Sequence, residues 1–165
     1  MKGLGETSNS SAFEYQKALL TAARTFAFYH WEHNTKRVKE FFHITGYADD
    51  QVYRGYDHEM RSPNIVRAAE ESRGAIVTYQ GRLALTPYFS RSDGRTRDWS
   101  EVWYGTVDWL KSVPTPCDQR KGRQLWGHGV GMSATEALCM AGEQGMNWTS
   151  ILKYFYTGTE VTRRW

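Results

Sequence analysis

The chain is poor in cysteine: Cys117 and Cys139 are its only two, and they lie too far apart to form a CxxC motif. A thiolate metal site or a redox pair is therefore not expected, whereas a single disulfide between them stays open. No apolar run approaches the ~20 residues that a membrane-spanning helix requires. No cluster of lysine and arginine is dense enough to indicate a nucleic-acid-binding surface. The composition thus gives no support to a membrane span or to nucleic-acid binding.

The first residues, MKGLGETSNSS, lack the apolar segment of a signal peptide. A helix is predicted to begin almost at once, and we expect the chain to be a fragment cut from a longer protein. It contains no repeat, linker or low-complexity stretch, and its length fits one domain, residues 1–165.

Aromatic residues are abundant, with 7 Trp, 10 Tyr and 7 Phe making up 15% of the chain. A hydrophobic core does not need so many rings with polar groups, so we expect some of them to line a binding surface. The net charge of +3 at pH 7 is small, but it favours an anionic polymer as the ligand.

A long buried helix is predicted over residues 12–33. Ser11 and Glu14 form an S-x-x-E capping box, and apolar residues then fill most of the helix circumference in ALLTAARTFAF. Arg24 lies in the middle of this helix. Because an unpaired buried charge is very costly, its guanidinium must find an anionic or carbonyl partner.

A second helix and a hairpin are predicted next. Ser62 and Pro63 stand at the start of that helix and Gly74 stands just past its end. The runs 75–79 and 82–86 flank a Gln-Gly turn and predict two antiparallel strands.

The C-terminal part predicts two more helices. Ser133 with Glu136 forms a second capping box, Asn147 is expected to cap the last helix, and Gly158 is expected to end it. Loops are predicted at residues 91–106 and around the two prolines at 114 and 116. Because regular βαβ alternation is missing, the sequence favours an α+β fold with a small antiparallel sheet and C-terminal helices.

The stretch LWGHGVGMSATEA places Gly127, Gly129 and Gly131 at alternate positions around His128, directly before a predicted helix. The βαβ unit of a dinucleotide site and the Lys-Ser/Thr pair of a P-loop are both missing, so nucleotide binding is not favoured. Two alternatives remain. The segment is a tight turn whose glycines adopt positive φ, or a bare backbone that lets a ligand approach with His128 pointing at it.

Several blocks of the chain resemble the SpoIID/LytB domain family, in one colinear order over nearly the whole length. They are ALLTAARTFAF, DDQVYRGYD, AAEESRGAIVTYQGR, PYFSRSDGRT, VDWLKSVPTPCD, GHGVGMS and AGEQGMNWTSILKYFYTGTEV. Members of this family are lytic transglycosylases that cut peptidoglycan between N-acetylmuramic acid and N-acetylglucosamine, and SpoIID-like members prefer strands stripped of stem peptides. The resemblance therefore implies a bacterial, extracytoplasmic enzyme of the cell wall, in a family related to sporulation.

The resemblance identifies Glu6 as the catalytic acid, since the family's glutamate stands eighteen residues before the arginine of the AART helix, here Arg24. Thr7 and Ser8 follow it where the family usually has Met-Pro, which changes the local loop but not the carboxylate. This one group protonates the leaving oxygen and then takes the proton of the muramic acid C6 hydroxyl, which closes a 1,6-anhydro ring. Because the acid must start protonated, burial is expected to raise its pKa.

Other positions of the family's motifs are expected to bind the substrate: Arg24, Tyr53, Tyr88, Ser90, Ser92, His128, Gly129 and Ser133. Hydroxyl groups can hydrogen-bond the acetamido and hydroxyl groups of a sugar, and rings can stack on its apolar face. Structural roles are the alternatives, as core rings, turn residues or, for Ser133, a helix cap. Arg24 would oppose a raised pKa of Glu6, so we place it on the substrate or on backbone carbonyls.

The implied reaction needs no cofactor. Some members of the family hold zinc with a histidine and two cysteines before the QVY motif, but Thr45 and Asp50 stand at the cysteine positions here, so zinc is not expected. The implied partners are stripped glycan strands and an amidase that removes stem peptides. Four arginines suit the free lactyl carboxylates of such strands: Arg54, Arg91, Arg95 and Arg97.

Two other functions compete with this one. The changed residues after Glu6 keep open a non-catalytic module that binds glycan or serves as a scaffold. Hydrolysis is the third alternative, and it requires a second carboxylate, such as Asp93, within reach of Glu6 to activate water.

Overall fold

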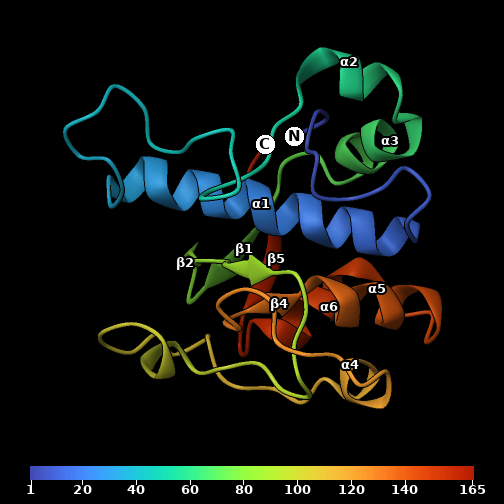
Figure 1. The fold of residues 1–165 in the computed structure, drawn as a ribbon. Coiled ribbons are helices and arrows are strands. Elements are labelled where there is room, and N and C mark those ends of the chain that lie inside the picture. The colour runs from blue at the N-terminus through green and yellow to red at the C-terminus, as the bar shows by residue number, and fades with distance from the viewer.

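The computed structural model describes residues 1–165, which fold around one long helix (Figure 1). This helix, α1 (Phe13–His33), runs through the middle of the molecule. On one side of it lie α2 (Gly55–Met60) and α3 (Pro63–Glu71), and on the other lie a small sheet and the C-terminal helices. The predicted α+β class and the long N-terminal helix are confirmed.

α1 is buried on most sides over its first half because small and apolar side chains alternate there. Ala18, Leu19, Leu20, Ala22 and Ala23 are each at most 1% exposed. The alanines let neighbouring elements pack close to the helix axis, while the leucines supply most of the apolar area removed from water. This burial is the main source of the fold's stability.

The capping box predicted at Ser11 is wrong. The helix begins after Ala12 without a side-chain cap. Glu14 instead accepts a hydrogen bond from the backbone N–H of Trp148 at 2.9 Å and forms an ion pair with Lys17 at 2.6 Å. Trp148 is the first residue of another helix, whose N–H groups lack partners within that helix. Glu14 therefore satisfies the start of a different helix from its own.

A three-stranded antiparallel sheet has β1 (Ala75–Tyr79) at its centre, between β2 (Arg82–Leu83) and β5 (Glu160–Arg163). Gln80 and Gly81 have φ values of 49° and 77°, as a type I′ hairpin turn requires. The predicted hairpin is confirmed, although its second strand is shorter than predicted. The sequence did not predict β5, which is short and mostly exposed.

The C-terminal half carries a separate parallel pair, β3 (Tyr88–Phe89) with β4 (Met132–Ser133). Its helices are α4 (Pro116–Arg120), α5 (Ala134–Gly142) and α6 (Trp148–Phe155), and one turn of 3₁₀ helix covers Trp99–Glu101. The predicted caps of α5 and α6 are confirmed, because the side chains of Ser133 and Asn147 accept backbone N–H bonds from the first turn of each.

Two short helices were not predicted: α4 lies in the loop predicted around the prolines at 114 and 116, and α2 lies before the predicted second helix. Gly55 adopts a φ of 76° and opens α2 directly, and Pro116 occupies the first turn of α4. Both helices are too short to show a helical repeat of hydrophobic residues in the sequence.

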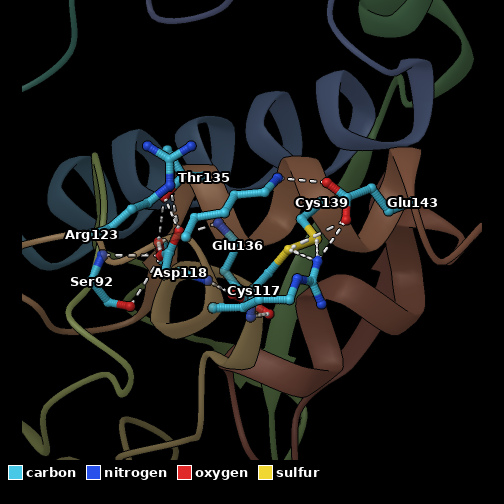
Figure 2. Close-up of a disulfide and its surroundings, with 11 residues drawn as sticks. Ser92, Cys117, Asp118, Arg123, Thr135, Glu136, Cys139 and Glu143 are labelled. Atoms are coloured by element: carbon cyan, nitrogen blue, oxygen red, sulfur yellow. Dashed lines mark hydrogen bonds and ion pairs between the residues drawn. A yellow bond between two sulfur atoms is a disulfide. The ribbon is translucent and has the colours of Figure 1, made fainter.

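Cys117 and Cys139 form a disulfide that joins α4 to α5 (Figure 2). The alternative left open by the sequence is thereby decided in favour of a disulfide.

None of the helices combines the length and the apolar character needed to cross a membrane.

Candidate functional site

A cleft with a volume of about 780 Å³ opens where the N-terminal segment, the loop before α2 and the glycine segment meet. Four of the predicted site residues line it: Glu6, Tyr88, Ser90 and His128. They come from three distant parts of the chain, so only the folded structure brings them together.

Glu6 is positioned by backbone pairing rather than by a helix or a long strand. Leu4 forms an antiparallel bridge with Tyr53, and the N–H of Gly5 donates to the carbonyl of Val52 at 2.9 Å. Leu4 is 2% exposed and anchors the segment in the core. The end of the loop that precedes α2 therefore holds the N-terminal segment and points the Glu6 carboxyl into the cleft.

The Glu6 carboxyl is half-buried and has two hydrogen-bond donors. The hydroxyl of Tyr88 donates to Oε2, and the backbone N–H of Val52 donates to Oε1 at 3.2 Å. Burial raises the pKa of Glu6 above its ordinary value, and the two hydrogen bonds oppose this rise only in part. The carboxyl thus stays protonated to a higher pH than a solvated glutamate, which is what a general acid needs.

Tyr88 connects Glu6 to the parallel β3–β4 pair, because its hydroxyl binds the Glu6 carboxyl and its backbone belongs to β3. Burial, and then the neighbouring charge of Glu6, raise the pKa of the Tyr88 hydroxyl well above its ordinary value. The hydroxyl therefore keeps its proton and acts as a donor. The strand β3 fixes the position of Tyr88 through its pairing with Met132 of β4.

The glycine segment packs closely against the chain around β3. Gly127, Gly129 and Gly131 all have positive φ. A Cβ added to Gly131 would lie 2.1 Å from the carbonyl oxygen of Pro87, which no side chain could tolerate. The side of each glycine on which a Cβ would stand is thus packed against the protein and not open to a ligand. This agrees with the first alternative, a tight turn whose glycines adopt positive φ.

His128 lines the cleft together with Gly127 of the same segment. Its Nε2 lies 3.1 Å from the carbonyl oxygen of Tyr88, and its Nδ1 accepts from the N–H of Val130 at 3.1 Å. Nε2 must therefore carry the proton. Burial lowers the pKa of His128, so the ring is neutral at pH 7 and both of its nitrogens are occupied by the backbone. Its exposed ring edge and face are what it offers to the cleft.

Arg24 lies outside the cleft lining. Its guanidinium donates to the carbonyl oxygens of Ser72 and Ala75 at 2.8 and 2.9 Å, and to the hydroxyl of Ser72 at 3.3 Å. Burial lowers its pKa to about 10, which still leaves it charged at pH 7. Arg24 therefore ties α1 to the end of α3 and the start of β1.

Ser92 and Ser133 are both fully buried, and neither lines the cleft. Figure 2 shows Ser92 beside the carboxylate of Asp118, which also accepts a hydrogen bond from Ser133. Oδ2 of Asp118 accepts from the hydroxyls of Ser92 at 3.0 Å and Ser133 at 2.7 Å, and Arg123 forms an ion pair with Oδ1 at 3.2 Å. Thr135 adds a further bond to Oδ1. This network fixes the segments that follow β3 and β4.

Tyr53 and Gly129 also lie outside the cleft lining. Tyr53 is 58% exposed and its ring covers Gly3. Gly129 is buried, and its carbonyl oxygen accepts from the N–H of Arg97 at 2.8 Å. The structure thus divides the predicted residues into four that line the cleft and five that support it.

Sequence reasoning missed the aromatic wall of the cleft, which we define as Trp99, Trp103 and Trp126. The ring of Trp103 lies 4.9 Å from that of His128 and 4.5 Å from that of Trp99, measured between centroids. Trp126 is 65% exposed. The abundance of aromatic residues indicated that a binding surface exists, but not which rings form it.

Ion pairs and hydrogen bonds to Asp50 stabilise the loop before α2. Asp50 and Thr45 stand at the two positions where the resemblance places zinc-binding cysteines in some family members. The buried carboxylate of Asp50 accepts from Lys36, from Arg37 at 3.3 Å and from the N–H of Thr45 at 2.8 Å. Burial alone would raise its pKa, but these bonds outweigh it and lower the pKa to about 2. The described residues around Asp50 thus form an ion-pair network in which no cysteine takes part.

Comparison with known proteins gives a family match over the first half of the chain. The family model described as "Stage II sporulation protein" matches residues 4–79, which include Glu6 and Arg24. Stage II sporulation protein D of Bacillus amyloliquefaciens is 30% identical over 71 residues, 43% of this chain and 21% of that protein. The amidase enhancer of Bacillus subtilis (strain 168) is 31% identical over 127 residues, 76% of this chain and 16% of that protein.

The matched region spans only 16% to 26% of the length of these curated relatives. Stage II sporulation protein D of Bacillus subtilis (strain 168) matches in the same way, at 30% identity over 66 residues. The segment that carries Glu6, the whole of α1 and the following loop, α3 and β1 all fall within the family match. Residues 4–79 of this chain therefore match the SpoIID family, and the relatives named Stage II sporulation protein D support the same family.

Proposed function

We propose that this chain is a peptidoglycan lytic transglycosylase domain that cleaves the bond between N-acetylmuramic acid and N-acetylglucosamine in stripped glycan strands. The match to the SpoIID family supports a role connected with the cell wall and sporulation. The observation that carries the finer proposal is the Glu6 carboxyl, half-buried in a cleft with a raised pKa and no second free carboxylate beside it.

The chemistry follows from the protonation state of Glu6. The neutral carboxyl gives its proton to the glycosidic oxygen as the bond to C1 of the muramic acid breaks. The resulting carboxylate then takes the proton of the C6 hydroxyl, whose oxygen bonds to C1 and closes the 1,6-anhydro ring. One group acts first as acid and then as base, and the proton count balances without water. The donors from Tyr88 and Val52 stabilise the carboxylate between the two steps.

The aspartates that could act as a second carboxylate do not favour hydrolysis, because each is bound by a basic side chain. Asp93, the candidate for a second carboxylate, does not line the cleft and is bound by Arg97 at 2.7 Å. Asp49 and Asp50 line the cleft, but Arg37 and Lys36 bind them. A hydrolase needs a free carboxylate about 5–9.5 Å from the acid to act as nucleophile or to activate water. The cleft residues thus favour intramolecular ring closure.

Two further observations support the proposed setting. A disulfide such as Cys117–Cys139 persists in oxidising compartments, which supports an extracytoplasmic location. The relative named amidase enhancer supports an amidase as a partner, and the chemistry fits because an amidase produces the stripped strand.

The test is digestion of amidase-stripped glycan strands, followed by mass analysis of the ends. Wild-type protein is expected to release 1,6-anhydro ends, and Glu6→Gln should reduce the rate by about 10²–10⁴ because general acid catalysis is lost. Glu40→Gln is the matched control, since Glu40 is exposed, forms no ion pair and lies outside the cleft. Binding of the strands should survive in both variants.

Three results would overturn the proposal in different ways. Reducing ends in place of anhydro ends would make the protein a hydrolase. Wild-type rates in Glu6→Gln would remove Glu6 as the acid. Tight binding by the wild type without any product would establish the competing function, a non-catalytic glycan-binding module.

A further inference from the structure

Four arginines lie in the segments around the cleft. Two of them form ion pairs within the chain and two do not. Arg95 binds Glu101 at 2.8 Å and Arg97 binds Asp93 at 2.7 Å, so their charges are neutralised within the chain. Arg54 and Arg91 form no ion pair. Of these two, Arg54 is exposed, whereas Arg91 is partly buried. A partly buried guanidinium without an anion is costly unless a ligand completes it.

The guanidinium of Arg91 is held against an aromatic ring instead. It lies 5.3 Å from the ring centroid of Trp126, within the range of a cation–π contact. The two residues also form an antiparallel bridge, in which the N–H of Trp126 donates to the carbonyl of Arg91 at 2.9 Å. Backbone and ring together hold the Arg91 side chain beside Trp126. Its Nε is buried without a hydrogen-bond partner, so this donor is unsatisfied in the chain itself.

Trp126 links this pair to the cleft. Trp126 lines the same cleft as Glu6, and Arg91 lies against Trp126 outside the lining. Arg91 follows Tyr88, whose hydroxyl binds Glu6, by three residues, and so many residues of extended chain span roughly 10 Å. A ligand group at Arg91 would therefore belong to the sugar at Glu6 or to a near neighbour in the same strand.

We infer that Arg91 and Trp126 form a subsite for a sugar that carries a free carboxylate. The exposed indole face of Trp126 can stack on the apolar face of a pyranose ring. The guanidinium of Arg91 presents a fork of N–H donors that matches a carboxylate in geometry and charge. The inference rests on the proposed function only in that the ligand is a peptidoglycan glycan.

The subsite gives a physical reason to distinguish stripped strands from substituted ones. In a stripped strand the lactyl group of each muramic acid ends in a carboxylate. In a substituted strand that carbonyl is an amide, which has no charge and carries a peptide into the space beside Trp126. Arg91 would then keep an uncompensated charge at the edge of the cleft, and the amide would lose the charge-assisted bonds.

The experiment compares two probes that differ only in this charge: amidase-stripped glycan strands, and the same strands with their carboxyl groups methyl-esterified. Binding is measured in the Glu6→Gln background, so that cleavage cannot interfere. Charge-assisted hydrogen bonds are worth about 1.5–3 kcal/mol, and about 1.4 kcal/mol is tenfold in affinity. Arg91→Met should therefore weaken binding of the stripped strand at least tenfold and change binding of the ester by less than about twofold.

Two further variants separate charge recognition from packing. Trp126→Ala should weaken binding of both probes, because it removes the stacking surface. Arg82→Met is the matched control for net charge, since Arg82 is exposed on β2 and lies outside the cleft. It should leave the affinity for both probes unchanged.

Equal losses for both probes in Arg91→Met, or no loss for either, would overturn the inference. The outcome does not depend on turnover. A wild-type protein that prefers the charged strand without cleaving it, and loses that preference in Arg91→Met, would refute the proposed function and support the role of Arg91. A protein that makes anhydro ends but binds both probes equally would do the reverse.

Discussion

Replacing Tyr88 with phenylalanine tests how the protein tunes its proposed acid. The Tyr88 hydroxyl donates to the Glu6 carboxylate, so it stabilises the charged form and lowers the pKa of Glu6 against the opposing effect of burial. A hydrogen bond to a charged group is worth about 1.5–3 kcal/mol. Because Glu6 is half-buried and water can replace part of the bond, the lower end of that range applies.

Removing the hydroxyl should therefore strengthen proton binding at Glu6 by about tenfold, since 1.36 kcal/mol corresponds to one pH unit. The pKa of Glu6 rises further, and the protonated acid survives to higher pH. In Tyr88→Phe the alkaline limb of the pH–rate profile for anhydro-end release should thus move upward by about one pH unit.

The assay measures kcat/KM on stripped strands from acidic to alkaline pH. Tyr154→Phe is the control, because the Tyr154 hydroxyl donates to the carbonyl of Pro114 at 2.7 Å and does not line the cleft. Its profile should match that of the wild type. An alkaline limb that stays in place in Tyr88→Phe, or moves to lower pH, would refute the argument that Tyr88 holds down the pKa of a catalytic Glu6.

Three further predictions concern stability and need no substrate. Burial raises the pKa of Glu6 above its unfolded value, so the carboxylate opposes folding once the pH exceeds that unfolded value; urea unfolding should show Glu6→Gln gaining stability over the wild type from acidic to neutral pH, and a constant difference would contradict this. Changing both Cys117 and Cys139 to alanine opens a loop with a separation of 22 residues and should lower the free energy of unfolding by about 3 kcal/mol, whereas a reductant should lower only the wild type. Gly131→Ala places a Cβ 2.1 Å from the carbonyl oxygen of Pro87 at a φ of 78°, and should cost about 2 kcal/mol or more in thermal unfolding; a neutral result would mean that the glycine segment can move away.

Local patterns predicted the parts of the fold that depend on neighbours in sequence. The apolar run of α1, the hairpin turn at Gln80 and the caps at Ser133 and Asn147 each follow from a few adjacent residues. The cap predicted at Ser11 failed because Glu14 binds the backbone of Trp148, 134 residues away. A pattern read along the chain cannot detect such a long-range competitor.

The same limit applies to the site. Glu6 and Arg24 were found by their spacing in a family motif, but no spacing reveals that Arg24 binds the carbonyls of Ser72 and Ala75. The family resemblance predicts Ser92 as a sugar ligand, because it stands at a motif position and has a hydroxyl group. The structure surrounds this hydroxyl with buried partners, among them Asp118, and this depends on how α4 packs against the β3–β4 pair.

Glu6 lies beside the core without being part of it: Leu4, two residues before it, belongs to the core cluster, whereas Glu6 lines the cleft. Glu6 is held by the returning end of the loop before α2, and an ion-pair network at Asp50 ties that loop together, whereas the stability of the fold resides in α1 and the elements packed on it. The loop can therefore change in sequence while α1 and the elements packed on it keep their packing. A variant whose loop loses its ordering is expected to keep the fold and the aromatic wall, while the carboxyl of Glu6 loses its fixed position.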